Sequence, residues 1–102
     1  MTPVVITNEN FDKEVMQSEK PVLIDFYADW CGPCKMLAPI VEKIAEERED
    51  VKICKVNVDN ERQLAANFDV MSIPTVVVVK SGKLYRKSVG LVPKQKLLEM
   101  LD

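Results

Sequence analysis

Short apolar-rich runs recur along the chain. They are "VLIDFYA" after Pro21, "VKICKVNVD" over Val51–Asp59 and "IPTVVVVK" over Ile73–Lys80. The first run is apolar throughout except for Asp25 and predicts a strand buried on both faces of a parallel sheet. The other two predict a second and a third strand. "PVVI" at Pro3–Ile6 predicts a further short strand, placed at an edge because proline lacks a ladder donor.

Between these runs the apolar residues are spaced as in helices. The clearest stripe extends from about Cys34 to Glu49 and consists of Leu37, Ile40, Val41, Ile44 and Ala45. A helix after Thr7 would place Phe11, Val15 and Met16 on one side, with Thr7, Asn8 and Asn10 as candidate caps. Asn60 and Gln63 match a capping box that opens a third helix. Pro93 suits the first turn of a last helix, whose inward residues would be Leu97, Leu98 and Leu101.

The order of these elements predicts the fold class. Ser81-Gly82 is a turn signal, and "KLYRKSVG" after it predicts the returning strand of a hairpin. Strands separated by helices favour parallel pairing with right-handed crossovers, and the hairpin adds an antiparallel edge. We therefore predict an α/β fold: a central mixed five-stranded sheet flanked by four helices, in a single domain over residues 1–102.

Composition and charge narrow the function classes. The chain is 47% hydrophobic and 29% charged, as in an ordinary soluble globular protein. Its net charge is -2 and the sequence shows no cluster of five or more basic residues, so we expect no nucleic-acid partner. No stretch approaches the roughly 18 apolar residues of a spanning helix, and the N-terminus does not resemble a signal peptide. Three cysteines in 102 residues favour a reducing, cytoplasmic compartment over a secreted disulfide scaffold.

Two of the cysteines stand two residues apart, in "FYADWCGPCKMLAPI". A zinc site usually needs four Cys or His ligands, whereas the chain has three cysteines and no histidine, so we expect no metal. A structural disulfide is a second alternative. It would close a ring of only four residues, worth about 2 kcal/mol by chain entropy, and its geometry would be strained.

A redox site explains the surroundings of the pair as well as the pair itself. The cysteines lie between the end of a predicted strand and the start of a predicted helix, where open α/β sheets bind and react. The helix N-terminus should lower the pKa of Cys31 and make it the attacking thiolate, with Cys34 as the resolving thiol. Gly32 lets a substrate approach the backbone, and Pro33 limits the conformations of the dithiol.

At these residues the chain resembles the thioredoxin family. "WCGPCK" is that family's active-site motif, and "VLIDFYADWCGPCK", "VNVD", "IPTVVVVKSGK" and "VG" follow in its order and spacing. The resemblance covers the whole chain. It implies a protein-disulfide reductase with no cofactor beyond the Cys31–Cys34 redox disulfide, working as a monomer and recharged by a thioredoxin reductase.

The resemblance also implies roles outside the pair. Asp25 would exchange a proton with Cys34, and Lys55 in the neighbouring strand would be its partner. A carboxylate in a buried strand is costly unless paired, and its pKa should be raised by desolvation. A simple buried ion pair between Asp25 and Lys55 is the alternative.

The substrate surface follows from the same resemblance. Trp30 would flank the site, although ordinary core packing is an alternative for it. Pro74 would be a cis-proline facing the dithiol, and the Ile73 backbone would pair with an extended substrate segment. Gly90 would keep another edge of the groove flat, or could simply end a strand.

The sequence departs from the family pattern in several places. Tyr27 stands where many members have a second tryptophan, and Met71-Ser72 replace a common glycine before Ile73. Cys54 is additional, and strand alternation places it with Val56 and Val58 in the core, opposite Lys55, with a regulatory thiol as the alternative. Two other functions remain open: a disulfide oxidant or isomerase, against which Gly32-Pro33 argues, and a redox-independent interaction subunit.

Overall fold

The computed structural model describes residues 2–102. The elements follow one another in the order β1 (Val4–Val5), η1 (Asp12–Met16), β2 (Val22–Tyr27), α1 (Gly32–Glu47), β3 (Lys52–Asn57), α2 (Arg62–Asn67), β4 (Thr75–Lys80), β5 (Lys83–Val89) and α3 (Lys94–Met100). η1 is a π-helix of a single turn. The predicted succession of strands and helices is confirmed.

The strands form one mixed sheet in the order β1-β3-β2-β4-β5. β2 is central, and all six of its residues pair in parallel with β3. β4 pairs antiparallel with β2 and with β5. Strands separated by a helix were expected to be parallel, and for β4 this expectation is wrong. The connection through α2 begins and ends at the same edge of the sheet, so β4 runs antiparallel to both of its neighbours.

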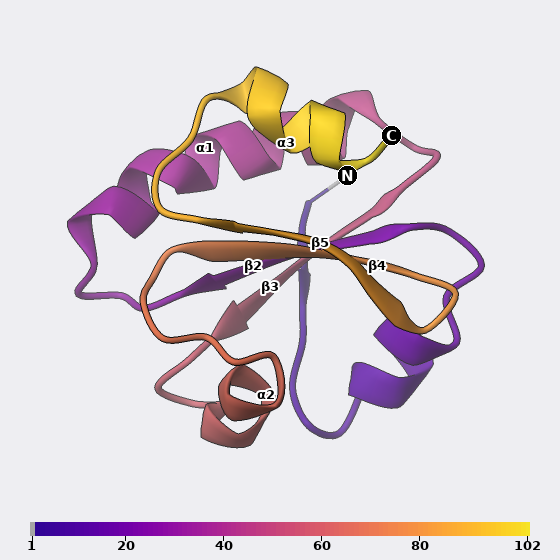
Figure 1. Ribbon diagram of the computed structural model, residues 1–102, viewed down its shortest axis with the longest axis horizontal. Helices are drawn as coiled ribbons and strands as arrows, with labels where there is room; N and C mark the ends of the chain where they lie inside the picture. The colour runs from indigo at the N-terminus through magenta and orange to yellow at the C-terminus, as the bar shows by residue number, and fades with distance from the viewer. Residues whose placement is uncertain (1) are drawn as a thin grey trace.

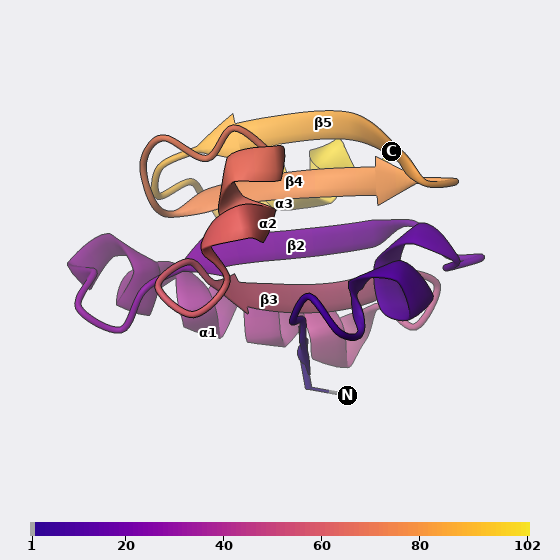
Figure 2. The same ribbon diagram turned by 90° about the horizontal axis from the view of Figure 1, so that it is seen from below.

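Helices cover both faces of the sheet, as expected (Figure 1). α1 and α3 lie over one face and α2 and η1 over the other, and Figure 2 shows α2 in front of the strands with α1 behind them. Alternating residues of β2 separate the two cores, because Leu23 packs with α1 and α3 while Ile24 and Phe26 pack on the opposite side. None of the helices in the described range has the length and apolar character needed to cross a membrane.

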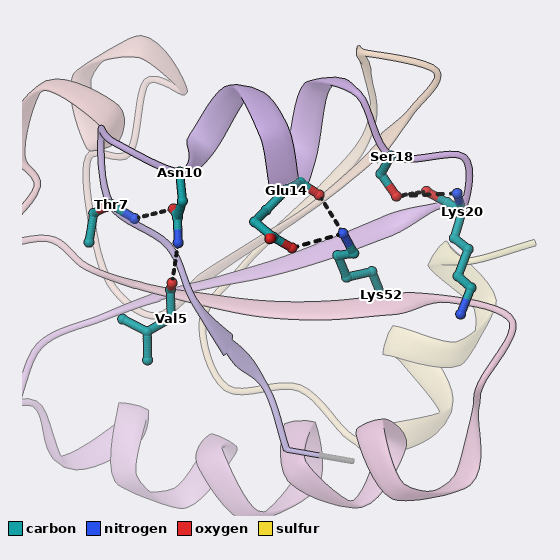
Figure 3. Close-up of polar contacts among 7 residues, drawn as sticks. All are labelled: Val5, Thr7, Asn10, Glu14, Ser18, Lys20 and Lys52. Carbon is teal, nitrogen blue, oxygen red and sulfur yellow. Dashed lines mark hydrogen bonds and ion pairs between the residues drawn. The ribbon is translucent and has the colours of Figure 1, made fainter.

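The polar residues predicted to cap the first helix make other contacts. The Asn10 side chain accepts from the Thr7 N–H at 2.8 Å and donates to the Val5 carbonyl at 2.9 Å, so it braces a loop and does not cap η1 (Figure 3). η1 is held to β3 by Lys52, whose ammonium contacts the Glu14 carboxylate at 3.0 Å. Within η1 only Val15 is buried, and Met16 is 40% exposed, contrary to expectation.

The other helix ends also need correction. α1 begins at Gly32, two residues before the expected start. The Asn60–Gln63 capping box does not form, because Glu61 holds the cap position and Gln63 donates instead to Asn67 Oδ1 at 2.9 Å. Pro93 is the residue before α3 and has an extended ψ of 158°. The turn between β4 and β5 is as predicted, since Ser81 and Gly82 both adopt positive φ, 51° and 75°.

Candidate active site

The two cysteines meet at the N-terminus of α1. Cys31 is the N-cap residue and Cys34 lies in the first turn, with a disulfide between them that spans 5.2 Å from Cα to Cα. The Cys34 N–H donates to Cys31 Sγ at 3.2 Å. A free backbone donor of the helix N-terminus therefore points at the sulfur of Cys31, where it stabilises negative charge.

β2 delivers the dithiol to this position. The strand ends at Tyr27, and the Cys31 N–H donates to the Ala28 carbonyl at 3.3 Å, which tightens the connection into α1. Ala28 packs in a small buried cluster with Cys31 and Cys34. Leu37, Val41 and Ile44 of α1 then anchor the helix against the sheet. The sulfurs thus lie at the carboxyl edge of the parallel strands, as the sequence predicts.

Ile73 and Pro74 come to the same place from a distant part of the chain. The Ile73–Pro74 bond is cis, as the resemblance implies. The Ile73 carbonyl oxygen lies 3.9 Å from Cys31 Sγ. The Gly90 N–H donates to the Pro74 carbonyl at 2.8 Å, and Gly90 has a φ of 95°, which favours glycine. The structure therefore brings Ile73 to the dithiol, with Pro74 next to it in the chain and Gly90 bonded to Pro74.

Trp30 does not belong to the core. Its side chain is 71% exposed, which rules out ordinary core packing. The indole Nε1 donates to Asp59 Oδ2 at 2.9 Å, and this bond fixes the ring beside the dithiol. A groove of about 490 Å³ separates Trp30 from the loop before Pro74. It is lined by Trp30, Cys31, Gly32, Pro33, Val58, Val70, Met71, Ser72 and Ile73.

Asp25 lies beneath the dithiol, buried in β2. It pairs in register with Lys55 of β3, yet its Oδ1 has no hydrogen-bond partner among the described residues. Burial raises its pKa from 3.8 to about 7, and the nearby Lys55 charge opposes that rise. The three ion pairs that the described residues form include neither side chain, so the simple buried ion pair is not what the structure has.

A second cavity connects Asp25 with Cys34. It measures about 380 Å³ and is lined by Pro3, Asp25, Tyr27, Ala28, Asp29, Cys34, Lys35, Ala38, Val41, Glu42 and Lys55. The Lys55 ammonium lies 5.8 Å from the centroid of the Tyr27 ring. Burial and the neighbouring Asp29 charge raise the pKa of Tyr27. This cavity offers room for water between the carboxyl group and the resolving sulfur.

Sequence reasoning missed Asp59, Val58 and Met71. Val58 and Asp59 follow the end of β3, and the rule that carboxyl ends of parallel strands share one edge could have identified them. Met71 lines the groove at 93% exposure and carries no sequence signal for this role. No group of three or more His, Cys, Asp or Glu side chains within residues 2–102 is arranged to hold a metal ion.

The dithiol lies at a helix N-terminus, on the carboxyl edge of a mixed sheet and near a buried carboxyl group. These features define a thiol–disulfide oxidoreductase. Comparison with known proteins specifies the family. The thioredoxin family model matches residues 2–102. The chain is 44% identical to thioredoxin 1 of Nostoc sp. over 98 residues, covering 95% of this chain and 92% of that one. It is 46% identical to the thioredoxin of Mycobacterium tuberculosis over 100 residues, covering 97% and 86% of the two chains.

Two further relatives extend the comparison. The chain is 43% identical to thioredoxin M5, chloroplastic, of Oryza sativa, of which it spans 58%, with 97% of this chain covered. The solved structure of a mutant thioredoxin from Halobacterium salinarum superposes with a TM-score of 0.90 at 36% identity, over 98% of this chain and 88% of that one. The chain belongs to the thioredoxin family and is a protein-disulfide reductase that uses the Cys31–Cys34 pair.

Proposed function

We propose that Cys31 is the nucleophile and Cys34 the resolving thiol of this reductase. The Cys31 thiolate attacks one sulfur of a substrate disulfide, that disulfide breaks, and the departing thiolate takes up a proton. Cys34 then loses its proton and attacks Cys31 Sγ, which releases the second substrate sulfur as a thiol. Two electrons and two protons pass from the protein dithiol to the substrate.

One observation supports this assignment above the others: the Cys34 N–H donates to Cys31 Sγ at 3.2 Å. Cys31 lies at the N-cap and receives a free donor of the helix, whereas Cys34 lies one turn inside. Negative charge is better stabilised at the first position than at the second, because the field of the helix end falls off within one turn. The attacking and resolving roles are therefore divided by position on the helix.

Asp25 is the proposed base for the resolving step. Its pKa of about 7 lets it accept a proton near neutral pH. It shares the 380 Å³ cavity with Cys34, so a water molecule there can carry the proton between them. Lys55 is proposed as a positioning residue, since its charge opposes the rise in the pKa of Asp25.

The groove beside Trp30 is the proposed substrate surface. Trp30, Gly32 and Pro33 form one wall, and Ile73 with its cis-proline forms the other. Backbone groups at Ile73 can pair with an extended substrate segment, in the manner of an added strand. Gly90 contributes a flat edge at the Pro74 side, because it presents no side chain there.

The reaction partners follow from this chemistry. Substrates are proteins with an accessible disulfide, and a thioredoxin reductase returns the oxidised protein to its dithiol form. The redox-active disulfide itself carries the electrons, so no further cofactor is required. We further propose that residues 1–102 act as one thioredoxin domain, as a monomer, in a cytoplasmic reducing environment.

Dithiothreitol-driven reduction of insulin tests the proposal. Wild type should accelerate the reaction and Cys31→Ser should not, while the matched control Cys54→Ser should keep its activity because Cys54 lies in the core away from the dithiol. Equal activity of wild type and Cys31→Ser would refute the redox role. The reduction potential distinguishes the oxidant alternative, which would require a value well above about −270 mV.

A further inference from the structure

Basic and acidic residues are segregated along this chain. Six of its 14 basic residues, and none of its 16 acidic ones, lie between Val70 and Leu98. The net charge of the whole chain, -2, does not reveal this uneven distribution of charge. β4, β5 and most of α3 come from that segment, while Glu99 and Asp102 follow directly after it. The segment therefore carries excess positive charge although no five basic residues are consecutive.

Three of these basic residues gather at Tyr85 on the edge strand β5, and a fourth lies beside one of them. The Lys80 ammonium lies 3.9 Å from the centroid of the Tyr85 ring, and the Arg86 guanidinium lies 4.9 Å from it. Lys83 pairs with Lys80 across the turn of the hairpin. Lys96 of α3 lines the same hollow as Arg86, which measures about 410 Å³. We call Lys80, Lys83, Tyr85, Arg86 and Lys96 the basic face.

Within residues 2–102, no cation of the basic face forms an ion pair. Among the described residues, the ion pairs involve Arg48, Lys52 and Lys94, none of which belongs to the face. Glu99 lines the hollow and Asp102 lies near Arg86, but neither forms an ion pair with the face. Tyr85 holds Lys80 and Arg86 by cation–π contact, so two positive charges are positioned before any partner arrives.

The strand that carries Tyr85 and Arg86 of the basic face leads toward the proposed substrate groove. β5 ends at Val89, and the next residue, Gly90, donates to the Pro74 carbonyl beside the dithiol. Arg86 precedes Gly90 by four residues of extended chain, which corresponds to about 13 Å along the strand. An extended substrate segment bound at Ile73 and Gly90 can reach the basic face within about four to six residues.

We propose that the basic face binds acidic segments of protein substrates that flank the disulfide being reduced. Carboxylates of the substrate lie over Arg86 and Lys96, while its half-cystine lies at Cys31. Positive residues on an edge strand also discourage pairing with other sheets, but that role needs neither the Tyr85 contacts nor Lys96 of α3. The inference rests on the proposed function and adds a substrate preference to it.

Single-turnover reduction of synthetic peptide disulfides tests the proposal. One peptide carries four glutamates about five residues before the half-cystine, a second carries them about five residues after it, and glutamine replaces glutamate in the matched controls. With wild type at low salt, at least one glutamate peptide should react about tenfold faster than its glutamine counterpart. The ratio should fall toward one at about 0.5 M salt, where charges separated by several ångströms are screened.

Two double variants locate the effect. Arg86→Glu/Lys96→Glu should abolish or invert the preference and leave reduction of the glutamine peptides unchanged. Lys13→Glu/Lys43→Glu changes the net charge equally on exposed helical positions outside the face and should keep the preference. Thermal unfolding of each variant establishes that it is folded.

The possible failures are distinguishable. Equal low-salt rates for glutamate and glutamine peptides would overturn the basic face as a substrate site. So would loss of the preference in both double variants, because net charge alone would then explain it. If wild type reduces none of the peptides, the proposed function fails, and the basic face fails with it.

Discussion

Asp25 of β2 stands directly opposite Lys55 of β3, yet the two side chains do not form an ion pair. The Asp25 carboxyl group is buried, with one oxygen that has no partner in the described chain. Its charge is therefore only partly compensated, and the pKa of the group rises to about 7. A fully paired carboxylate would stay ionised at neutral pH and would be a poor proton acceptor.

Replacement of Asp25 by Asn should slow the resolving step more than the attacking step. Loss of a positioned base typically costs about a hundredfold or more in rate. Rapid-quench measurement of the mixed disulfide with a substrate follows both steps across pH 6–9. Asp29→Asn lines the same cavity from an exposed position and should resolve normally. Unchanged resolution kinetics in Asp25→Asn would remove this residue from the mechanism.

The same substitution should stabilise the oxidised protein at high pH. The pKa of Asp25 is about 7 when folded and 3.8 without the fold, so the folded state binds the extra proton between these values. Stability contributed by this group therefore declines as pH rises from 4 to 7 and stays low above that. Asn cannot ionise, so Asp25→Asn should gain up to about 4 kcal/mol at pH 8 and little at pH 4.

Urea unfolding at the two pH values measures this difference. The gain should appear only at the higher pH, and Asp29→Asn should show none. An equal change at both pH values would mean that the substitution alters packing and not ionisation.

Removal of the Lys55 charge should raise the pKa of Asp25 further. The Lys55 charge lowers this pKa against the effect of burial, so Lys55→Met should move the pH midpoint above 7. The carboxyl carbon signal of Asp25 in an NMR titration reports the midpoint directly. Lys35→Met is the matched control, since Lys35 lines the same cavity without contributing to the shift. A midpoint that stays in place in Lys55→Met would contradict the assigned role.

Cys54 should be unreactive in the folded protein. Its side chain is completely buried, and burial raises its pKa to about 12, so almost no thiolate exists at pH 8. Iodoacetamide should modify Cys31, the attacking thiol of the reduced protein, and Cys54 only after unfolding. Mass spectrometry of the digested protein identifies the sites. Modification of Cys54 at a rate comparable to the dithiol would indicate an accessible regulatory thiol instead.

Trp30→Ala should impair binding of protein substrates with little loss of stability. The ring is 71% exposed, so its removal should change the unfolding free energy by less than about 1 kcal/mol. KM for insulin should rise severalfold, whereas reduction of the Cys31–Cys34 disulfide by dithiothreitol should be unaffected. Met36→Ala removes another exposed apolar side chain, one that does not line the groove, and serves as control. Equal KM values in the two variants would argue against a Trp30 contact.

Periodicity predicted the elements that pack the core. The apolar run of β2 and the apolar stripe on α1 are both buried as expected. A strand buried on both faces has a continuous apolar run, and a helix buried on one face has apolar residues at helical spacing. Cap positions were less predictable. Asn60 and Gln63 have suitable side chains, but the Asn60 N–H bonds to the Asn57 carbonyl and Gln63 to Asn67. Several neighbouring polar groups could bond the free N–H groups of the helix, and the backbone conformation of the folded protein determines which of them does.

The site itself was only partly visible in the sequence. The pair Cys31–Cys34 and its place on a helix follow from local spacing. Pro74 and Gly90 are distant in sequence, and only the family resemblance connected them with the dithiol. The bond between Trp30 and Asp59 depends on β3 ending beside β2, so it required the register of the sheet. The antiparallel direction of β4 likewise depends on the edge of the sheet to which the α2 connection leads.

The two hollows at the dithiol share no lining residue. A protein that fills the groove at Trp30 and Ile73 therefore leaves the cavity of Asp25, Lys55 and Cys34 open. Protons can then enter and leave by a separate entrance while a large substrate is still covalently attached. On the proposed mechanism, the resolving step would therefore not require the substrate to leave the groove first.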